Sequence, residues 1–551
     1  MCIVNNFPRT KLSKKQLDIK FVISYNIIIL ITLRHMFAES NNERSKIMKA
    51  TTRFLAFVFA AVMLLSLASC ADNQGNNNEI TTAPEATVDG EVTEELYLGY
   101  EKDRLPTNLN YNNETVKVLY WSDAERKEFE IKEDEDDSDR IVSAIKARNE
   151  VVQQRLGITF DWDSTKGNSK NRAAFTKYVE TQFNGGNYYD VIATYSRTSG
   201  MLATRGFLVD LNTIENNYID YEQNWWPATI IDVCTIGKSL YFVSGDISTN
   251  TLHFMYGIYF NKDLIAERQL EDPQTLVKNG TWTLSKLIEM TSDTYEDRDN
   301  SNSQSIEDFF GFCTVYFHCD AFYTGSDLRL VDNDEDNVLI ISPDFSGEKA
   351  ISLVDQLGQW LTTDSCYSDD TSGNYQKPFV NGTALFCQNR VYMADAQNGS
   401  GLNAVTWKYG ILPTPKYNED QENYITVMGN PFTLYGIGNG CDDPSRATAV
   451  IECWASEAYR RTTPAIFEVN MKLRYAKDDV DSQMFDILRA TCCYDLGRIF
   501  SDALSYMSEM PSKAAVAGTS WARSVKSQLT PLKNAIKGVV SDLEKNANLV
   551  R

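Results

Sequence analysis

Two hydrophobic periodicities alternate along the first third of the chain. Runs of apolar, aromatic and β-branched residues predict strands at 115–121, 158–162 and 189–195. Between them, apolar residues recur three or four positions apart and predict amphipathic helices at 138–156 and 172–183. This strand–helix succession is typical of a mainly parallel sheet with helical crossovers. We therefore predict an α/β fold.

The remaining chain continues the pattern less regularly. Short apolar runs predict strands at 240–243, 253–260 and 384–387. Near the C-terminus, helical periodicity returns at 447–459 and 524–549. Nothing in those two helices suggests chemistry.

Two acidic runs have structural interpretations. The run at 133–139 precedes the first predicted helix, where negative charge interacts favourably with the helix dipole, so we interpret it as a solvated helix entry and not as a metal site. The run at 332–337 alternates acids like a calcium loop. However, Asn337 stands where that loop has glycine and Pro343 where it has its closing glutamate. We expect a turn between strands there.

The chain carries the signals of an exported lipoprotein. From Met48, two cations are followed by an apolar run at 54–67 and then by small residues, which is the layout of a secretory signal. The tetrad that ends at Cys70, Leu-Ala-Ser-Cys, resembles the lipobox of bacterial lipoproteins, so we expect cleavage before a lipidated Cys70. An uncleaved membrane anchor is the alternative, although the run is shorter than the roughly 20 residues that span a bilayer.

The segments around this signal divide the N-terminal region into three. We expect residues 1–47 to lie outside the mature protein, residues 48–69 to be the signal peptide, and the polar stretch 70–95 to be a flexible tether. A lipidated cysteine on a tether predicts a location on the extracellular face of a bacterial cytoplasmic membrane.

Composition excludes several classes of function. The 53 Lys and Arg residues face 75 Asp and Glu residues, giving a formal charge of −22, whereas nucleic-acid binders are usually basic. Only three histidines occur, and the nine cysteines from Cys234 to Cys493 contain no Cys-x-x-Cys pair. We expect buried free thiols, no metal and no cofactor.

Polar and aromatic residues follow the first and third predicted strands. Trp121 is followed by Asp123, and Tyr195 by Ser196 and Arg197. Ligands in open α/β sheets bind beyond the carboxyl ends of the strands, and aromatic faces beside hydrogen-bonding groups suit sugars. The alternative is that Trp121 and Tyr195 are core residues.

Seven segments, in order, resemble one family. They lie at 148–162, 189–214, 237–248, 256–265, 280–290, 379–394 and 409–424. Together they are similar to the bacterial extracellular solute-binding proteins of ABC importers, in the sugar-binding group called family 1. The resemblance runs from about residue 115 to about residue 495.

The resemblance implies a two-lobed, periplasmic-binding-protein-like fold of type II, with a ligand cleft between lobes joined by crossover strands. It places lobe 1 at 96–252, lobe 2 at 262–425, and the return crossover with C-terminal helices that pack on both lobes at 426–551. The first crossing would be 252–261 and the return 426–438.

The resemblance and the strand ends together nominate ligand-binding residues. They are Trp121, Asp123, Tyr195, Ser196, Arg197, Asp246, His253, Tyr256, Arg390, Tyr392 and Asn430. Asp246 has the alternative of a turn or helix cap. Trp225 and Trp226 either face the cleft or pack a loop.

The function that follows is delivery of a carbohydrate, expected to be an oligosaccharide, to the transmembrane permease of an ABC transporter by a monomeric carrier without catalytic residues. A surface glycan sensor or lectin would use the same cleft and stays open. A glycosidase with two carboxylates about 5–10 Å apart is the third alternative, although no GxSxG, HExxH or P-loop pattern occurs.

Overall fold

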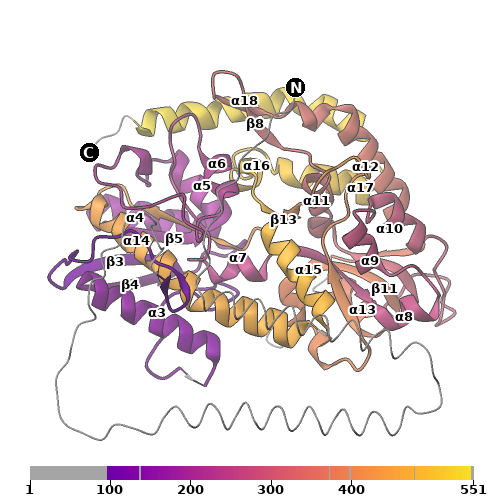
Figure 1. The fold of residues 1–551 in the computed structure, drawn as a ribbon. Coiled ribbons are helices and arrows are strands. Elements are labelled where there is room, and N and C mark those ends of the chain that lie inside the picture. Colours follow the sequence, from indigo (N-terminus) through magenta and orange to yellow (C-terminus); the bar gives the residue numbers. More distant parts are fainter. Residues whose placement is uncertain (1–95, 136–137, 371–372, 396–398, 477, 548–551) are drawn as a thin grey trace, which may run out of the picture. The chain divides into compact units, whose positions relative to one another are not determined.

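The computed structural model describes residues 96–547, except 136–137, 371–372, 396–398 and 477 (Figure 1). The described residues form one compact unit. The expectations for residues 1–47, the signal at 48–69, Cys70 and the tether at 70–95 lie outside the described residues.

The first lobe is built on a four-stranded sheet with the order β14-β5-β3-β4. Strands β3 (Glu114–Trp121), β4 (Ile158–Thr165) and β5 (Val191–Tyr195) are parallel to one another, and β14 (Thr433–Ile437) pairs antiparallel with β5. Helices α3 (Arg140–Leu156) and α4 (Arg172–Asn184) are the crossovers. The predicted α/β succession is therefore confirmed.

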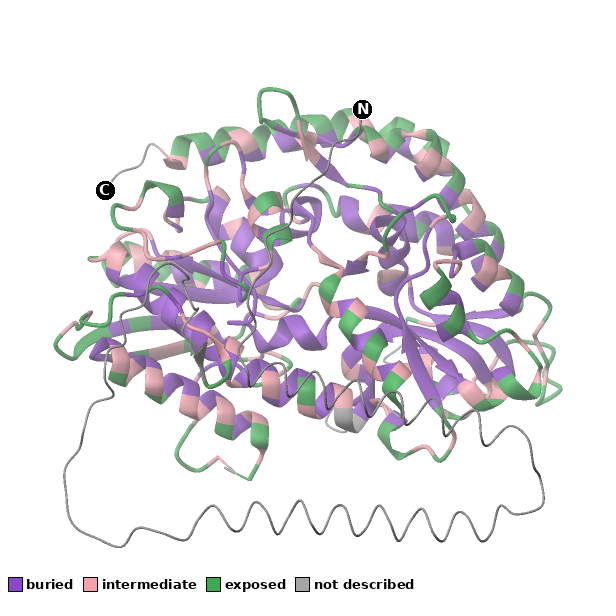
Figure 2. Cartoon of the chain, in the orientation of Figure 1, coloured by how far each residue is buried: buried purple, intermediate pink, exposed green. Residues whose placement is uncertain are grey.

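The second lobe contains a five-stranded sheet with the order β10-β7-β11-β6-β12. These strands are β6 (Tyr256–Asn261), β7 (Phe310–Thr314), β10 (Cys366–Ser368), β11 (Ala384–Arg390) and β12 (Tyr409–Leu412). Strands β7, β10 and β11 are parallel, and β6 runs antiparallel to β11 and β12. Figure 2 shows both sheets as largely buried elements.

Shorter elements complete the two lobes. In the first are α5 (Ser196–Thr204), η1 (Leu211–Thr213), α6 (Ala228–Cys234) and α7 (Thr249–His253). Between residues 262 and 404 are α8 (Lys262–Glu267), α9 (Pro273–Asn279), α10 (Leu284–Thr291), α11 (Tyr316–Gly325), β8 (Val331–Asn333), β9 (Leu339–Ile341), η2 (Pro343–Ser346), α12 (Glu348–Leu361), η3 (Asn374–Gln376), α13 (Lys377–Val380), η4 (Val391–Ala394) and η6 (Leu402–Ala404). A hairpin, β1 (Leu96–Tyr97) and β2 (Tyr100–Glu101), begins the described chain.

The chain passes between the two sheets at two neighbouring places. The first lies between α7 and β6, and the second between β13 (Thr426–Val427) and β14. The two segments are in contact. Met255 and Met428 form an isolated antiparallel β-bridge, and the amide of Gly429 donates a hydrogen bond to the carbonyl of Phe254 at 2.8 Å. A pair of adjacent crossing segments is the kind of connection about which two lobes hinge.

The C-terminal elements contact both lobes. They are α14 (Pro444–Arg460), the π-helical η7 (Pro464–Tyr475), α15 (Asp479–Ala490), β15 (Cys492–Cys493), α16 (Leu496–Ile499), η8 (Met507–Glu509), α17 (Met510–Val516) and α18 (Trp521–Ala547). Helix α18 starts at the second lobe, where the Trp521 indole donates to the Phe345 carbonyl at 3.2 Å. It ends at the first lobe, where Asn546 donates to the Ala203 carbonyl of α5 at 2.9 Å (Figure 1).

The structure confirms several of the local predictions and contradicts one of them. The expected turn between β8 and β9 is formed by residues 334–337, whereas residues 332 and 333 belong to β8. Asp139 at the end of the other acidic run caps α3, and Gly157 ends that helix at a φ of 59°. The predicted strand at 240–243 is wrong, because apart from a bridge between Val243 and Tyr435 this stretch has no strand partner in the described chain. All nine cysteines of the described chain are unpaired, and six of them are buried.

Candidate functional site

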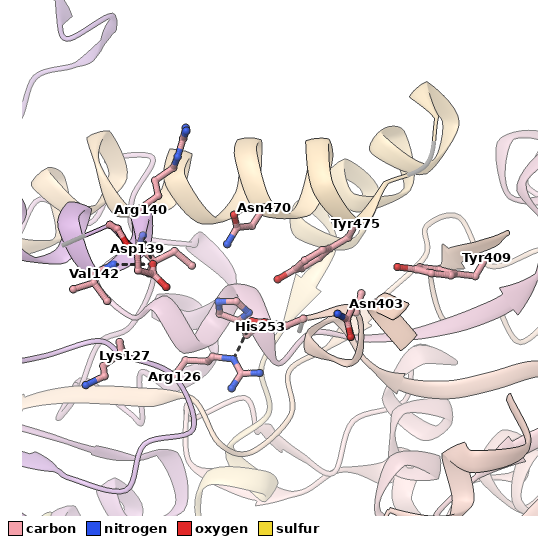
Figure 3. A pocket seen from close by; sticks show the side chains of 14 residues that line it. Arg126, Lys127, Asp139, Arg140, Val142, His253, Asn403, Tyr409, Asn470 and Tyr475 are labelled. Carbon is pink, nitrogen blue, oxygen red and sulfur yellow. Dashed lines mark hydrogen bonds and ion pairs between the residues drawn. The ribbon is translucent and has the colours of Figure 1, made fainter. Parts of the chain in front are cut away.

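A cavity of about 490 Å³ lies between the two lobes (Figure 3). Its wall comes from the first lobe, which includes α7, from the second lobe and from the C-terminal element η7. The residues are Arg126, Lys127, Ser138, Asp139, Arg140, Ile141, Val142, His253, Ala394, Asp395, Asn403, Tyr409, Asn470 and Tyr475. The volume is in the range that small-molecule sites occupy.

One rim of the cavity is the start of α3. The Asp139 carboxylate accepts from the amides of Ile141 at 2.8 Å and Val142 at 3.2 Å. An aspartate at the N-cap satisfies amides that have no partner within the helix, and this fixes where the helix begins. The capping interaction therefore positions the first-lobe wall.

Several polar atoms that line the cavity are buried without partners. Within the described chain, no hydrogen-bond partner exists for Nδ1 of His253, for Oδ1 of Asn470 or for Nη2 of Arg126, whereas Nε of Arg126 forms an ion pair with Asp395. The side chains of all three approach one another across the cavity, with the Tyr475 ring beside them (Figure 3). Because a buried polar group without a partner costs free energy, these atoms indicate a polar ligand.

Histidine 253 is a neutral member of this group. It is 1% exposed, and burial, followed by the nearby Arg126 charge, lowers its pKa to about 3 against the opposing effect of Asp395. A neutral imidazole offers one donor and one acceptor. Together with the amide of Asn470 and the guanidinium of Arg126, the cavity can both donate and accept hydrogen bonds.

Arg126 also connects the lobes. Its Nε lies 3.4 Å from Oδ2 of Asp395, and its guanidinium lies over the Tyr392 ring, 5.0 Å from the centroid. Arg126 follows β3 of the first lobe, whereas Tyr392 and Asp395 follow β11 of the second. The segments that follow the carboxyl ends of these two strands are thus in contact.

Further predicted residues cluster beside this contact. The Asn430 carbonyl accepts from the Ser196 hydroxyl at 2.7 Å, and its side-chain oxygen accepts from Arg498 at 3.0 Å. The Tyr256 hydroxyl donates to the Phe317 carbonyl at 3.0 Å, and Tyr256 is 1% exposed. Through these hydrogen bonds, the two crossing segments are held to α5, α11 and α16.

The first-lobe candidates are largely occupied within their own lobe. Trp121 is fully buried, and its indole donates to Thr433 at 3.0 Å. Tyr195 is 3% exposed and packs edge-on against Trp121 at 5.6 Å. Asp123 accepts from the Gly167 and Asn168 amides at 2.6 and 2.9 Å. The structure thus places the two aromatic residues in the core and uses Asp123 to hold a loop.

Two other candidates have partners from the C-terminal region. Arg197 pairs with Asp502 at 2.9 Å and with Glu509 at 3.3 Å. Asp246 is held by Arg489 at 3.1 Å and lines a different cavity, of about 710 Å³, in which none of the lining residues has a buried unpartnered side-chain atom. Trp225 and Trp226 are buried and donate to Glu452 at 3.1 and 2.8 Å, so they pack a loop.

The sequence analysis missed most of the cavity wall. Arg126 lies only five residues beyond β3, within reach of the strand-end argument. Asn470 and Tyr475 lie in η7, a segment with no local signal for a ligand. Only His253 was both predicted and found in this wall.

Comparison with solved structures identifies the architecture. A cyclo/maltodextrin-binding protein complexed with maltotetraose is similar over 80% of this chain and 99% of its own, with a TM-score of 0.51 and 11% sequence identity. The fold is that of the two-lobed sugar-binding proteins. The galacto-N-biose-/lacto-N-biose I-binding protein of the ABC transporter from Bifidobacterium longum, in complex with lacto-N-biose, is similar over 79% and 99% of the two chains, with a TM-score of 0.50 and 10% identity.

This binding-protein fold confirms the predicted fold class, and both of these neighbours are binding proteins. A scan against protein-family models and a search of curated proteins find no match for the sequence. No helix in the described part of the chain combines the length and the apolar character needed to span a bilayer.

Proposed function

We propose that this protein is a lipid-anchored extracellular solute-binding protein that captures a carbohydrate between its lobes and delivers it to the permease of an ABC transporter. The observation that carries the proposal is the group of buried, unpartnered polar atoms of Arg126, His253 and Asn470 at the contact between the two lobes. In a two-lobed binding fold, a ligand that satisfies atoms on both sides favours the closed arrangement.

The chemistry of the cavity suits a sugar. Tyrosines 409 and 475 offer ring surface, and the guanidinium, imidazole and amide offer directed hydrogen bonds. Sugars carry many hydroxyl groups that both donate and accept. The ligand leaves the protein unaltered, since its role here is to be bound and released.

Ligand capture is tested with the full chain, purified in mild detergent, in a thermal-shift screen against neutral and acidic oligosaccharides of two to four residues. A ligand that binds only the folded state raises the melting temperature. Any hit is followed by calorimetry on Asn470→Ala, which we expect to weaken binding at least tenfold, with Asn224→Ala, in the separate Asp246 cavity, as the matched control.

Product analysis on each hit distinguishes the alternatives. Recovery of intact sugar supports the carrier, whereas cleaved sugar replaces it with a glycosidase. If no carbohydrate raises the melting temperature, the carbohydrate proposal is wrong.

Anchoring and delivery need their own test. Replacement of Cys70 by alanine is expected to move the protein from the membrane fraction to the culture medium and to abolish its lipid modification in mass spectrometry. Loss of labelled-sugar uptake in the same strain would support transport; unchanged uptake would favour a surface sensor or lectin.

A further inference from the structure

A buried carboxylate, Glu128, lies two residues beyond Arg126 of the cavity wall and is 1% exposed. Its Oε2 accepts hydrogen bonds from the Ser248 hydroxyl at 3.1 Å and from the backbone amide of Asn250 at 3.2 Å. The side-chain amide of Asn250 donates to the same oxygen. A carboxylate buried this deeply is costly unless donors surround it, and here they do.

These donors belong to the start of α7, the helix that ends at His253. Ser248 is the N-cap residue of α7, but its own side chain makes no capping hydrogen bond. The first turn of a helix has amides that need acceptors, and a negative charge there is favourable. Glu128 supplies both, from a position 120 residues earlier in the chain. It thereby holds the helix whose last residue lines the cavity.

The same turn is bonded to the segment that carries two cations of the cavity. The Thr249 hydroxyl donates to the Lys127 carbonyl at 2.7 Å, and the Asn250 side chain donates to the Arg126 carbonyl at 3.4 Å. Arg126, Lys127 and His253 all line the cavity (Figure 3). The buried carboxylate therefore belongs to one hydrogen-bonded unit with the cation segment and with the histidine helix.

The second crossing segment is tied to this unit as well. The Tyr435 hydroxyl of β14 donates to Oε1 of Glu128, and the Thr433 amide donates to the Ser248 hydroxyl at 3.4 Å. The first-lobe ends of both crossing segments are thus bonded to one group of residues. Residues 254–255 and 428–432 lie beyond this network, and it is there that the two crossing segments contact each other.

On the second-lobe side, the first crossing segment meets β11. The guanidinium of Arg390, the last residue of β11, lies 5.3 Å from the ring centroid of Phe254 and 5.7 Å from that of Tyr256. Arg390 therefore packs against this crossing and is not among the residues that line the cavity. The crossing is held by the Glu128 network at one end and by β11 at the other.

We propose that Glu128 is a positioning residue for the cavity, which holds His253 and the Arg126 segment in their binding arrangement before a ligand arrives and confines lobe movement to residues 254–255 and 428–432. Groups that are already in place lose less conformational freedom on binding, so Glu128 raises affinity without touching the ligand. This inference rests on the proposed function, because it takes the cavity as the ligand site.

Variants separate positioning from general stability. Glu128→Leu removes the acceptor from the donors of α7, whereas Glu128→Gln keeps one acceptor oxygen and should restore part of the effect. Asn250→Ala is a milder change on the donor side, in case Glu128→Leu does not fold. The matched control is Asp308→Asn. Asp308 is also fully buried, but it accepts from the amides of Arg298 at 2.9 Å and Ser305 at 2.8 Å and does not line the cavity.

The readout without ligand is the imidazole of His253. The full chain in mild detergent is labelled with isotopic histidine and titrated by NMR, and His253→Asn assigns the signal among the three histidines of the sequence. Burial, followed by the Arg126 charge, lowers the His253 pKa to about 3, so we expect no protonation of the wild type above about pH 4.5.

In Glu128→Leu, α7 loosens and water reaches the ring, so the His253 pKa should rise above about 5. Loss of a negative charge by itself would lower the pKa of a histidine. The direction of the shift therefore identifies movement of α7 and excludes a direct effect of charge.

The outcomes are distinct. A rise in Glu128→Leu, a smaller rise in Glu128→Gln and none in Asp308→Asn support the positioning role. No rise in any Glu128 or Asn250 variant, or an equal rise in Asp308→Asn, overturns it.

Binding provides the second readout. For each oligosaccharide of two to four residues that binds the wild type, Glu128→Gln should weaken binding about tenfold and Asp308→Asn less than about twofold. Equal affinities of Glu128→Gln and wild type overturn the positioning role. If no oligosaccharide binds, the proposed function is wrong, and the titration of His253 still decides whether Glu128 positions α7.

Discussion

A buried ion network in the first lobe supports one quantitative prediction. Asp103 accepts hydrogen bonds from Arg155 Nη1 at 2.6 Å, from two nitrogens of Arg460 at 3.2 Å each, and from the Ser456 hydroxyl at 2.8 Å. The side chains of Asp103 and Arg460 are fully buried. This carboxylate thereby ties the chain before β3 to helices α3 and α14.

Asp103→Asn keeps the shape of the side chain and removes its charge. Glu457 would remain as a carboxylate near these arginines, at 3.7 Å from Arg155, 3.1 Å from Arg460 and 2.9 Å from Arg461. Breaking a buried pair by removal of one partner leaves an uncompensated charge and costs about 3–5 kcal/mol. We expect a loss of that size in the free energy of unfolding at pH 7.

The assay is equilibrium urea unfolding followed by tryptophan fluorescence at several pH values. Although burial opposes it, hydrogen bonding and charge interaction with Arg155 and Arg460 hold the pKa of Asp103 below its usual 3.8. The stability that it contributes is therefore present above pH 3.8 and is lost as the pH falls through the lower folded value. The gap between wild type and Asp103→Asn should stay constant from pH 5 to 7 and shrink below about pH 3.8.

A matched exposed variant provides the control. Glu222 lies 3.8 Å from Arg104, with the two side chains 85% and 68% exposed, so Glu222→Gln should cost at most about 0.5 kcal/mol. If Asp103→Asn costs no more than this control, or if its effect does not shrink in acid, the network does not have the role assigned here.

Three further predictions follow from buried contacts. Burial raises the pKa of Glu452 to about 8, so its protonated form favours folding and the free energy of unfolding falls as the pH rises from 4.5 to 8. In urea titrations, Glu452→Gln should reduce that fall by at most about 4 kcal/mol, and an unchanged dependence on pH would contradict the prediction. Trp521→Ala removes a 1% exposed indole that stacks edge-on against Phe345 and should cost about 3–5 kcal/mol by calorimetry; a loss below 1 kcal/mol would mean that α18 is not held there. Asp139→Ala should cost about 1 kcal/mol through its N-cap, whereas Asp139→Ser should restore most of it, and equal losses would refute the capping role.

Local patterns fixed the elements of the first lobe because their causes are local. The capping of α3 by Asp139, its end at Gly157 and the parallel order of β3, β4 and β5 all follow from short-range spacing and from the handedness of crossovers. The prediction of a strand at 240–243 was wrong because it rested on the local pattern alone. Its apolar residues fit a strand, but a strand exists only where another strand pairs with it.

The sequence by itself determined the α/β fold, the positions of most strands and helices, and the importance of the strand ends. Only the tertiary structure decided which polar groups at those ends are free, because that depends on partners hundreds of residues away. Arg197 finds Asp502 and Asp246 finds Arg489, so both are held in ion pairs, although Nη2 of Arg197 has no hydrogen-bond partner in the described chain. Arg126 and His253 each keep one buried nitrogen, Nη2 and Nδ1, without a hydrogen-bond partner in the described chain where the two lobes meet, although Nε of Arg126 pairs with Asp395.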